Sequence, residues 1–258
     1  MSILAAACTD VGTRKNVNQD SYGFRIADTA IGEVAFAVVC DGMGGLAQGE
    51  YASAGVTLAF LDWFERDFPY LVAGLRQDGF ASVIGQWRNL INDQNLFLIE
   101  RGRQCGADIG TTLTAGLFAC GAGVLIGHVG DSRTYRIANG MEQLTEDHTF
   151  VENEVKNNRM TPEQAFNDPR RNILLQCIGV NHYLSPLFVR DLTQISGLYL
   201  LCSDGFRHQI GDKELFRALA DGNLRTEDDM RERLRELTAE NIRRGEVDNI
   251  TSVLLRIQ

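Results

Sequence analysis

The sequence predicts an α+β fold in which strands and helices form separate layers. Runs of the β type, rich in Val, Leu, Ile and Thr, and runs of the helical type fall in separate blocks, whereas a βαβ fold would alternate them. The chain has 258 residues, 44% of them hydrophobic, and contains no repeat, low-complexity tract or Pro/Ser-rich linker. That length and composition suffice for one substantial core, so we expect a single domain spanning residues 1–258.

Each expected strand is a short apolar run bounded by Gly or Asp. The expected strands are residues 2–9, 33–40, 111–118, 123–129, 134–137, 198–202 and 251–257.

Each expected helix carries apolar residues at helical spacing. Val83, Trp87 and Ile91 recur in this way in one segment, and Thr226 is placed to act as the N-cap of another. The expected helices are residues 50–66, 80 to about 103, 212–220 and 226–243.

The segment of about residues 150–180 is polar and contains Thr-Pro and Asp-Pro turns. We expect it to form a flap near a cleft. An ordinary surface helix and loop is the alternative.

Composition excludes several classes of protein. A net charge of -9 and a pI near 5.0 argue against nucleic acid as the main partner. The N-terminal stretch lacks the features of a signal peptide, and no run approaches the roughly 20 apolar residues of a membrane helix. The six cysteines form no C-x-x-C pair, so we expect free thiols in a cytoplasmic protein.

Five aspartates are set among Gly, Ser or Asn, mostly at the edge of an apolar run. A carboxylate in such a place can point into a cleft. Several that converge repel one another unless cations bind them, and oxygen-only ligands select hard ions such as Mg2+ or Mn2+. The five are Asp20, Asp41, Asp131, Asp204 and Asp248.

Asp41 is followed by Gly42-Met43-Gly44-Gly45. Glycine lets the backbone turn sharply and brings a carbonyl within reach of a metal, which a side chain at Gly42 would impede. A plain glycine turn between a strand and a helix is the alternative. Asp204-Gly205 repeats the arrangement after another apolar run.

Eight motifs follow one another between Thr9 and Leu255: T-D-V-G-T-R-K-N-V-N-Q-D, V-C-D-G-M-G-G, G-T-T-L, H-V-G-D-S-R-T-Y, L-T-E-D-H-T, D-P-R-R-N-I-L, L-C-S-D-G-F and D-N-I-T-S-V. In this order they resemble the metal-dependent protein phosphatases of the protein phosphatase 2C (PPM) family, in the compact bacterial form. Any one motif is weak, but eight in order are highly specific.

The resemblance implies a four-layer α-β-β-α sandwich, two antiparallel sheets flanked by helices, with a dinuclear metal centre at one end. Asp41 would bridge two Mn2+ or Mg2+ ions, and the carbonyl of Gly42 would bind one of them. Asp204 and Asp248 would complete the direct ligands. Asp131 would hold a third, weaker ion together with Asp204. Asp20 would act mainly through metal-bound water.

Three departures from the family pattern concern catalysis. Met43 stands where the animal enzymes carry a histidine that is a candidate general acid, so the leaving-group proton must come from metal-bound water or another group. Gln19 replaces a glutamate. The family's phosphate-binding arginine falls on Lys15, with Arg14 one place earlier. A lysine holds phosphate as a point charge, not bidentately.

The implied activity is hydrolysis of phosphoserine and phosphothreonine in proteins by a metal-activated bridging water. The expected catalytic residues are Asp41, Asp204, Asp248, Arg14 and Lys15. The expected partners are phosphorylated proteins, namely a bacterial Ser/Thr protein kinase and its substrates, and we expect a monomer. The alternative is a catalytically silent module of the same fold that only binds a phosphoprotein.

Of the four histidines, His128 lies in an expected strand and is interpreted as a core or sheet-edge residue. His148, in the D-H-T motif, has two open interpretations, a role near the flap or none. His182 and His208 carry no signal.

Overall fold

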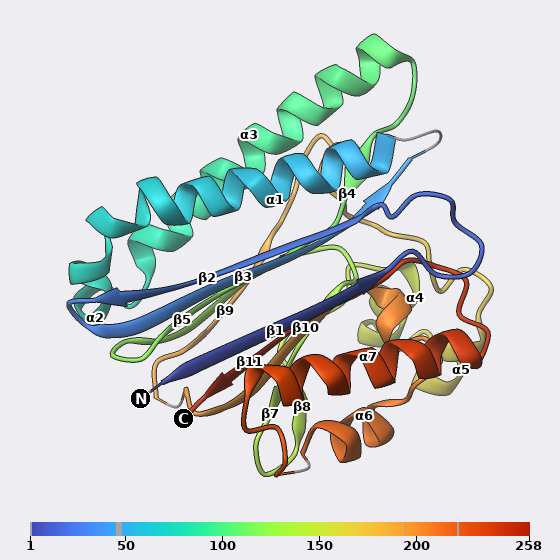
Figure 1. Cartoon of the computed structure of the whole chain (residues 1–258). Coiled ribbons are helices and arrows are strands. Elements are labelled where there is room, and N and C mark those ends of the chain that lie inside the picture. Colours follow the sequence, from blue (N-terminus) through green and yellow to red (C-terminus); the bar gives the residue numbers. More distant parts are fainter. Residues whose placement is uncertain (1, 45–47, 194, 221) are drawn as a thin grey trace.

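The computed structural model of the chain describes residues 2–44, 48–193, 195–220 and 222–258. It is a sandwich of two antiparallel sheets with helices on both outer faces (Figure 1). Helices α1 (Gln48–Arg66) and α3 (Ala81–Cys105) cover one sheet, and α6 (Asp212–Leu219) and α7 (Glu227–Arg243) cover the other. The predicted four-layer α-β-β-α architecture is therefore confirmed.

The first sheet has the strand order β1-β11-β10-β7-β8. Its strands are β1 (Ile3–Asp10), β7 (Arg133–Ile137), β8 (Met141–Gln143), β10 (Gly197–Cys202) and β11 (Ile250–Ile257).

The second sheet has the order β2-β3-β5-β6-β9, and the short strand β4 pairs with β3 beside that path. Its strands are β2 (Asp20–Thr29), β3 (Gly32–Met43), β4 (Gly110–Thr111), β5 (Leu113–Ala119), β6 (Gly123–Val129) and β9 (Leu187–Asp191).

The remaining helices are short. They are α2 (Leu75–Asp78), α4 (Phe150–Lys156), α5 (Pro162–Asn167) and the 3-10 turns Phe68–Tyr70, Val72–Gly74 and Asp204–Phe206.

Strand β3 is a continuous apolar run because both of its faces are buried. Phe36 and Val38 belong to the core beneath α1 and α3, where Phe36 lies 6.0 Å from the ring of Trp87. Ala35 and Ala37 alternate with them and face the other sheet, in a core that includes Phe118. Small residues between the sheets and aromatic residues under the helices thus fix β3 at the centre of the molecule.

Every predicted strand and helix corresponds to an observed one, with boundaries that shift by a few residues. Thr226 caps α7 as predicted, since its hydroxyl accepts a hydrogen bond from the backbone N–H of Asp229. Strands β2, β8 and β9 were not predicted, nor were the short helices.

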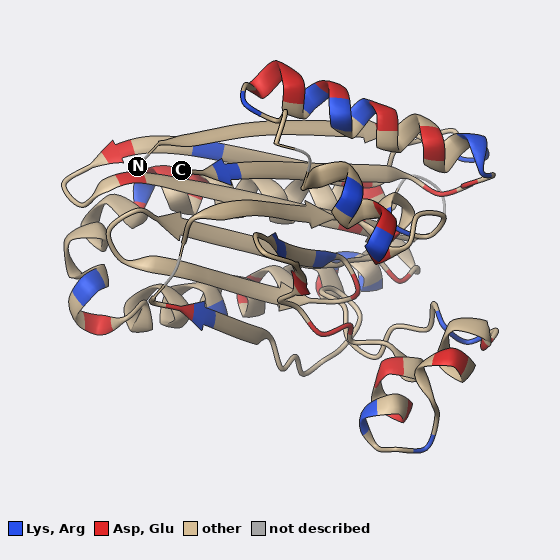
Figure 2. Ribbon diagram, turned by 90° about the horizontal axis from the view of Figure 1, so that it is seen from below, with Lys and Arg blue, Asp and Glu red and all other residues tan. Residues whose placement is uncertain are grey.

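Charged residues lie mainly on helices and connecting segments, and few lie along the strands (Figure 2). Within the described ranges, no helix combines the length and apolar character needed to cross a membrane. All six cysteines are free thiols, and Cys105 is the exposed one.

Candidate metal centre

The five aspartates come from five segments that meet at one end of the sandwich, where β1 ends and β2 begins (right-hand side of Figure 1). Asp20 is the first residue of β2, and Asp41 lies near the end of β3. The two are cross-strand partners in the antiparallel register. Two carboxylates directly opposite each other destabilise a sheet unless something compensates their charge.

The other three aspartates follow or precede strands at the same end. Asp131 comes after β6, Asp204 after β10 and Asp248 before β11. Burial raises the pKa of Asp41 well above its usual range, and the charges of the other four aspartates raise it further. The negative charges of the other four aspartates therefore all act on Asp41, as expected if the five carboxylates converge.

The G-T-T-L motif holds Asp41 in place. The backbone N–H of Asp41 donates to the Thr112 hydroxyl over 2.9 Å, and the Asp41 carbonyl accepts from the Thr112 N–H over 2.8 Å. The Thr112 hydroxyl also lies 2.8 Å from that of Ser132, next to Asp131. Thr112 therefore connects the two segments that carry Asp41 and Asp131.

Gly42 has to be a glycine because of close backbone packing. A Cβ atom there would lie 2.1 Å from the Gly49 carbonyl oxygen and 2.5 Å from that of Gln19. The Gly42 N–H donates to the same Gln19 carbonyl over 3.0 Å. The Gln19 N–H in turn donates to the side chain of Asn249 over 2.9 Å. The D-N motif thus ties the segment before β11 to the segment before β2.

Burial raises the pKa of both Asp20 and Asp131 to about 7. In each case the negative charge of Asp204 raises it further, while hydrogen bonds from Ser203 and Thr251 oppose the rise at Asp20 and Arg207 opposes it at Asp131.

The pKa of Asp204 is shifted in the opposite direction. Burial alone would raise its pKa, but a hydrogen bond from His208, the charges of His208 and Arg207 and a hydrogen bond with Asp41 lower it to about 2. Burial would also lower the pKa of His208, but hydrogen bonds to Asp204 and Glu246 raise it to about 10.

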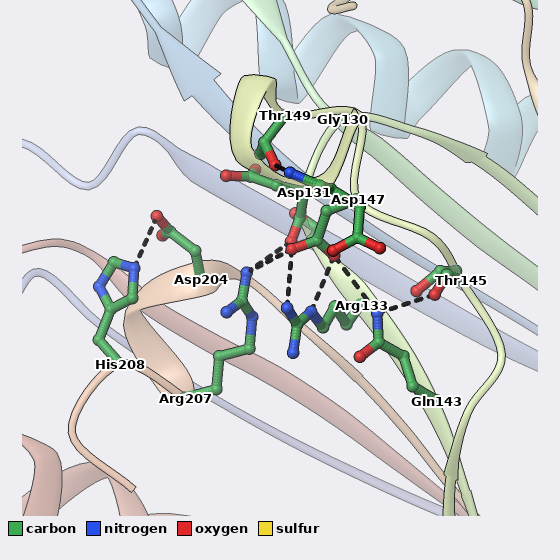
Figure 3. Close-up of polar contacts among 12 residues, drawn as sticks. Gly130, Asp131, Arg133, Gln143, Thr145, Asp147, Thr149, Asp204, Arg207 and His208 are labelled. Carbon is green, nitrogen blue, oxygen red and sulfur yellow. Dashed lines mark hydrogen bonds and ion pairs between the residues drawn. The ribbon is translucent and has the colours of Figure 1, made fainter. Parts of the chain in front are cut away.

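His208 is a site residue that the sequence did not reveal. Its Nε2 lies 3.2 Å from Asp204 Oδ2, and Figure 3 shows the ring directed at that carboxylate. The signal available was its position four residues after Asp204, just after the turn Asp204–Phe206.

Oxygen atoms left without partners indicate that the site fits a divalent cation. Asp20 Oδ2 accepts from the Ser203 hydroxyl over 2.7 Å, whereas Asp20 Oδ1 is buried without a hydrogen-bond partner among the described residues. Asp204 Oδ1 is likewise buried and without such a partner. Buried polar atoms are normally satisfied, and hard cations take such oxygens as ligands. Within the described ranges, however, no three His, Cys, Asp or Glu side chains already form a ready ligand set, so binding requires the carboxylates to adjust.

An ion-pair network lies beside Asp131 (Figure 3). Arg133 donates to both carboxylate oxygens of Asp147 over 2.8 Å each. Arg207 Nη2 donates to the backbone carbonyl of Asp131 over 3.1 Å and lies 3.3 Å from Asp147. The network fixes the backbone that carries Asp131.

The two candidate phosphate-binding residues differ in position. Lys15 Nζ lies 3.2 Å from Asp248 Oδ1, and both side chains remain partly exposed. Arg14 is exposed and forms no ion pair with the described part of the chain. Lys15 is therefore the one that the structure brings to the aspartates.

Helices α4 and α5 lie in the segment predicted to be a flap. A cavity of about 490 Å³ is lined by Val151, Ala165 and Phe166 on these helices and by Asp131 and Arg207 from the site. The segment therefore borders the same cavity as the aspartates.

Arg170 braces this segment. Its guanidinium lies 4.3 Å from the centre of the Phe150 ring and pairs with Asp168 over 2.9 Å. The rings of His128 and His148 lie 5.1 Å apart, centre to centre. His128 is buried between the Thr114 hydroxyl and the Gly130 carbonyl, as predicted, and His148 accepts from the Gly130 N–H.

Comparison with known proteins gives a consistent result. The family model described as protein phosphatase 2C matches residues 12–241. The serine/threonine protein phosphatase PstP of Mycobacterium tuberculosis is 32% identical over 258 residues, which cover 96% of this chain. The match spans 44% of PstP, so the chain corresponds to less than half of that protein.

Solved structures agree with this. The crystal structure of the serine/threonine phosphatase Stp1 from Staphylococcus aureus superimposes with a TM-score of 0.84 at 30% identity, covering 100% of this chain and 96% of that one. The catalytic domain of PstP in complex with two manganese ions superimposes with a TM-score of 0.73 at 29% identity, covering 98% of this chain and 97% of that one.

Proposed function

The chain belongs to the protein phosphatase 2C family, and we propose that it hydrolyses phosphoserine and phosphothreonine in proteins with the help of two divalent cations. The observation that carries the proposal is the meeting of five aspartates from separate segments. Two of them keep a buried carboxylate oxygen that has no hydrogen-bond partner among the residues the structure describes.

The proposed ligands follow the family pattern. Asp41 would bridge the two ions, the Gly42 carbonyl would bind one of them, and Asp204 and Asp248 would complete the direct set. These groups come from β3, from the turn after β10 and from the segment before β11. Asp20 would act through water.

We assign Asp131 to a third, weaker ion, held jointly with Asp204. Asp131 belongs to a segment that Arg207 and Thr112 hold from either side.

When bound, Mn2+ or Mg2+ would supply Lewis acidity for activating water and for stabilising the charge that develops on the phosphoryl group. The chain's own groups supply orientation. Lys15 is exposed enough to turn from Asp248 toward a phosphate and would hold it as a point charge. Met43 has no proton to donate to the leaving oxygen of the substrate.

The cavity beside α4 and α5 would receive the polypeptide next to the phosphorylated residue. The flap segment contributes apolar lining from Val151, Ala165 and Phe166 together with the charged Glu152, and the site contributes Asp131 and Arg207. This arrangement supports the flap interpretation and a protein substrate. A bacterial Ser/Thr protein kinase and its targets are the proposed partners.

The test is an assay with a phosphothreonine peptide and with p-nitrophenyl phosphate, in Mn2+ and in excess EDTA. We expect turnover of both substrates in Mn2+ and none in EDTA, with Asp41→Asn inactive. Phosphopeptide binding without turnover of either substrate in Mn2+ would instead identify a silent binding module.

A further inference from the structure

His208 joins the two segments of the first sheet that carry proposed metal ligands. Its Nε2 lies 3.2 Å from Asp204 Oδ2, and its Nδ1 lies 3.3 Å from Glu246 Oε2. Asp204 follows β10, whereas Glu246 precedes β11. The imidazole therefore spans the gap between the two segments at the metal-binding end.

Glu246 continues the connection to Asp248. Its carboxylate is buried, with a side-chain exposure of 3%. Oε1 accepts the backbone N–H of Val247 over 2.8 Å and that of Asp248 over 2.9 Å. One chain of contacts thus runs from the carboxylate of Asp204 through His208 and Glu246 to the backbone of Asp248.

This chain of contacts determines which oxygen of Asp204 is available. His208 occupies Oδ2, and Oδ1 remains buried without a partner in the described part of the chain. Carboxylates that bind metals depend on such outer contacts for their orientation.

We propose that His208 and Glu246 are positioning residues that hold Asp204 and Asp248 in the relative placement that a pair of divalent cations requires. The inference rests on the proposed function, because it concerns the same metal centre.

A positioning role of His208 and Glu246 can be distinguished from an effect of their charges. If His208 carries a proton, the imidazolium and the Glu246 carboxylate have no net charge together, so the pair as a unit would add little net field at the cations. Each single substitution, by contrast, leaves an uncompensated charge. If the pair acted only through charge, His208→Ala would strengthen cation binding, Glu246→Ala would weaken it, and the double variant would resemble the wild type.

The experiment is calorimetric titration of Mn2+ into EDTA-stripped protein for the wild type, His208→Ala, Glu246→Ala and the double variant. We expect all three variants to bind Mn2+ more weakly, by about 10–100-fold, as when outer-shell partners of metal ligands are removed. We also expect the double variant to lose less than the two single losses combined, because each single change breaks the same connection.

Arg244→Ala is the matched control. Arg244 also bridges two carboxylates, Glu214 and Glu240, near the end of α7, but it contacts none of the proposed ligands. We expect it to leave Mn2+ affinity unchanged. His208→Gln keeps an amide donor for Asp204 and should bind Mn2+ with intermediate affinity. It also serves as the test variant if His208→Ala does not fold.

The outcomes are distinguishable. Wild-type affinity in both His208 variants, or tighter binding in His208→Ala with weaker binding in Glu246→Ala, overturns the positioning role and leaves the proposed function intact. A wild-type protein that binds no Mn2+ contradicts the proposed function itself.

Discussion

Asp20 and Asp41 lie directly opposite each other on the antiparallel strands β2 and β3. Burial raises the pKa of both. The charge of Asp20 raises the pKa of Asp41 further, and the charges of Asp204 and Asp248 raise the pKa of both aspartates. A sheet would not place two such groups face to face for stability alone. The arrangement is understandable if the folded chain keeps these carboxylates for cations.

The two aspartates should differ in their effect on catalysis. Asp41→Ala should abolish activity nearly completely, because a bridging carboxylate contacts both ions. Asp20→Asn should reduce turnover by about 10–100-fold, as expected for a group that acts through water. Steady-state kinetics on a phosphothreonine peptide in saturating Mn2+ measures both. Equal activity in the two variants would show that the bridging assignment is wrong.

Substitution of Asp131 should affect turnover without affecting tight metal binding. Asp131→Ala should still bind two Mn2+ ions tightly, because Asp131 is not among the proposed ligands of the tight pair, while turnover of phosphopeptides falls. Calorimetry and kinetics on the same preparation test this. Loss of the tight sites in Asp131→Ala would place this residue in the central pair.

Gly42→Ala should destabilise the protein by about 1–3 kcal/mol, the usual cost of forcing extra atoms into a packed region. The added Cβ would lie 2.1 Å from the Gly49 carbonyl oxygen, so the backbone must move. Gly55→Ala is the control, since nothing lies within 4 Å of a Cβ there and the site is in α1. That change should stabilise the protein by about 0.5–1 kcal/mol. Urea denaturation in EDTA measures both, and equal effects would contradict the steric explanation.

His128 should make stability depend on pH. Burial lowers its pKa from the ordinary 6.5 to about 3, helped by the charge of His148. Between these values the unfolded chain binds a proton that the folded protein does not. The free energy of unfolding therefore has its full value above pH 6.5 and falls as the pH is lowered toward 3. One proton corresponds to about 1.4 kcal/mol per pH unit.

The contribution of His128 is isolated by comparison with His128→Gln, which removes the titrating group. The free energy of unfolding should fall more steeply in the wild type than in the variant between pH 6.5 and 4.5. Parallel curves would show that His128 is not held neutral in the folded protein.

The sequence predicted those elements whose apolar residues follow a clear local pattern. Strand β3 could be predicted because both faces are apolar, and α7 because Thr226 caps a helix with one apolar face. Strand β2 could not, because it is an edge strand with mixed burial and a glycine inside it. Gly23 in β2 allows close approach of Leu61 from α1, a tertiary contact that no local pattern reveals.

In the candidate site, too, the residues with a local signal could be predicted, and those that depend on tertiary contacts could not. The five aspartates were identifiable because each stands in a motif at the edge of a strand. His208 was not, because its role depends on Glu246, 38 positions further along the chain, and on the pairing of β10 with β11. The sequence left Lys15 and Arg14 open as phosphate-binding residues, and the contact of Lys15 with Asp248 became visible only in the fold.

The most direct test of the central claim, that these aspartates form one cation site, is the melting temperature with and without Mn2+. Ions that bind only the folded cluster stabilise it by RT ln(1 + [L]/Kd), about 2.7 kcal/mol at 100 times the dissociation constant. A chain of this size responds by roughly 2–4 °C per kcal/mol, so millimolar Mn2+ should raise the melting temperature by several degrees. The rise should shrink in Asp204→Asn and in Asp248→Asn. A melting temperature indifferent to millimolar Mn2+ in the wild type would contradict the account.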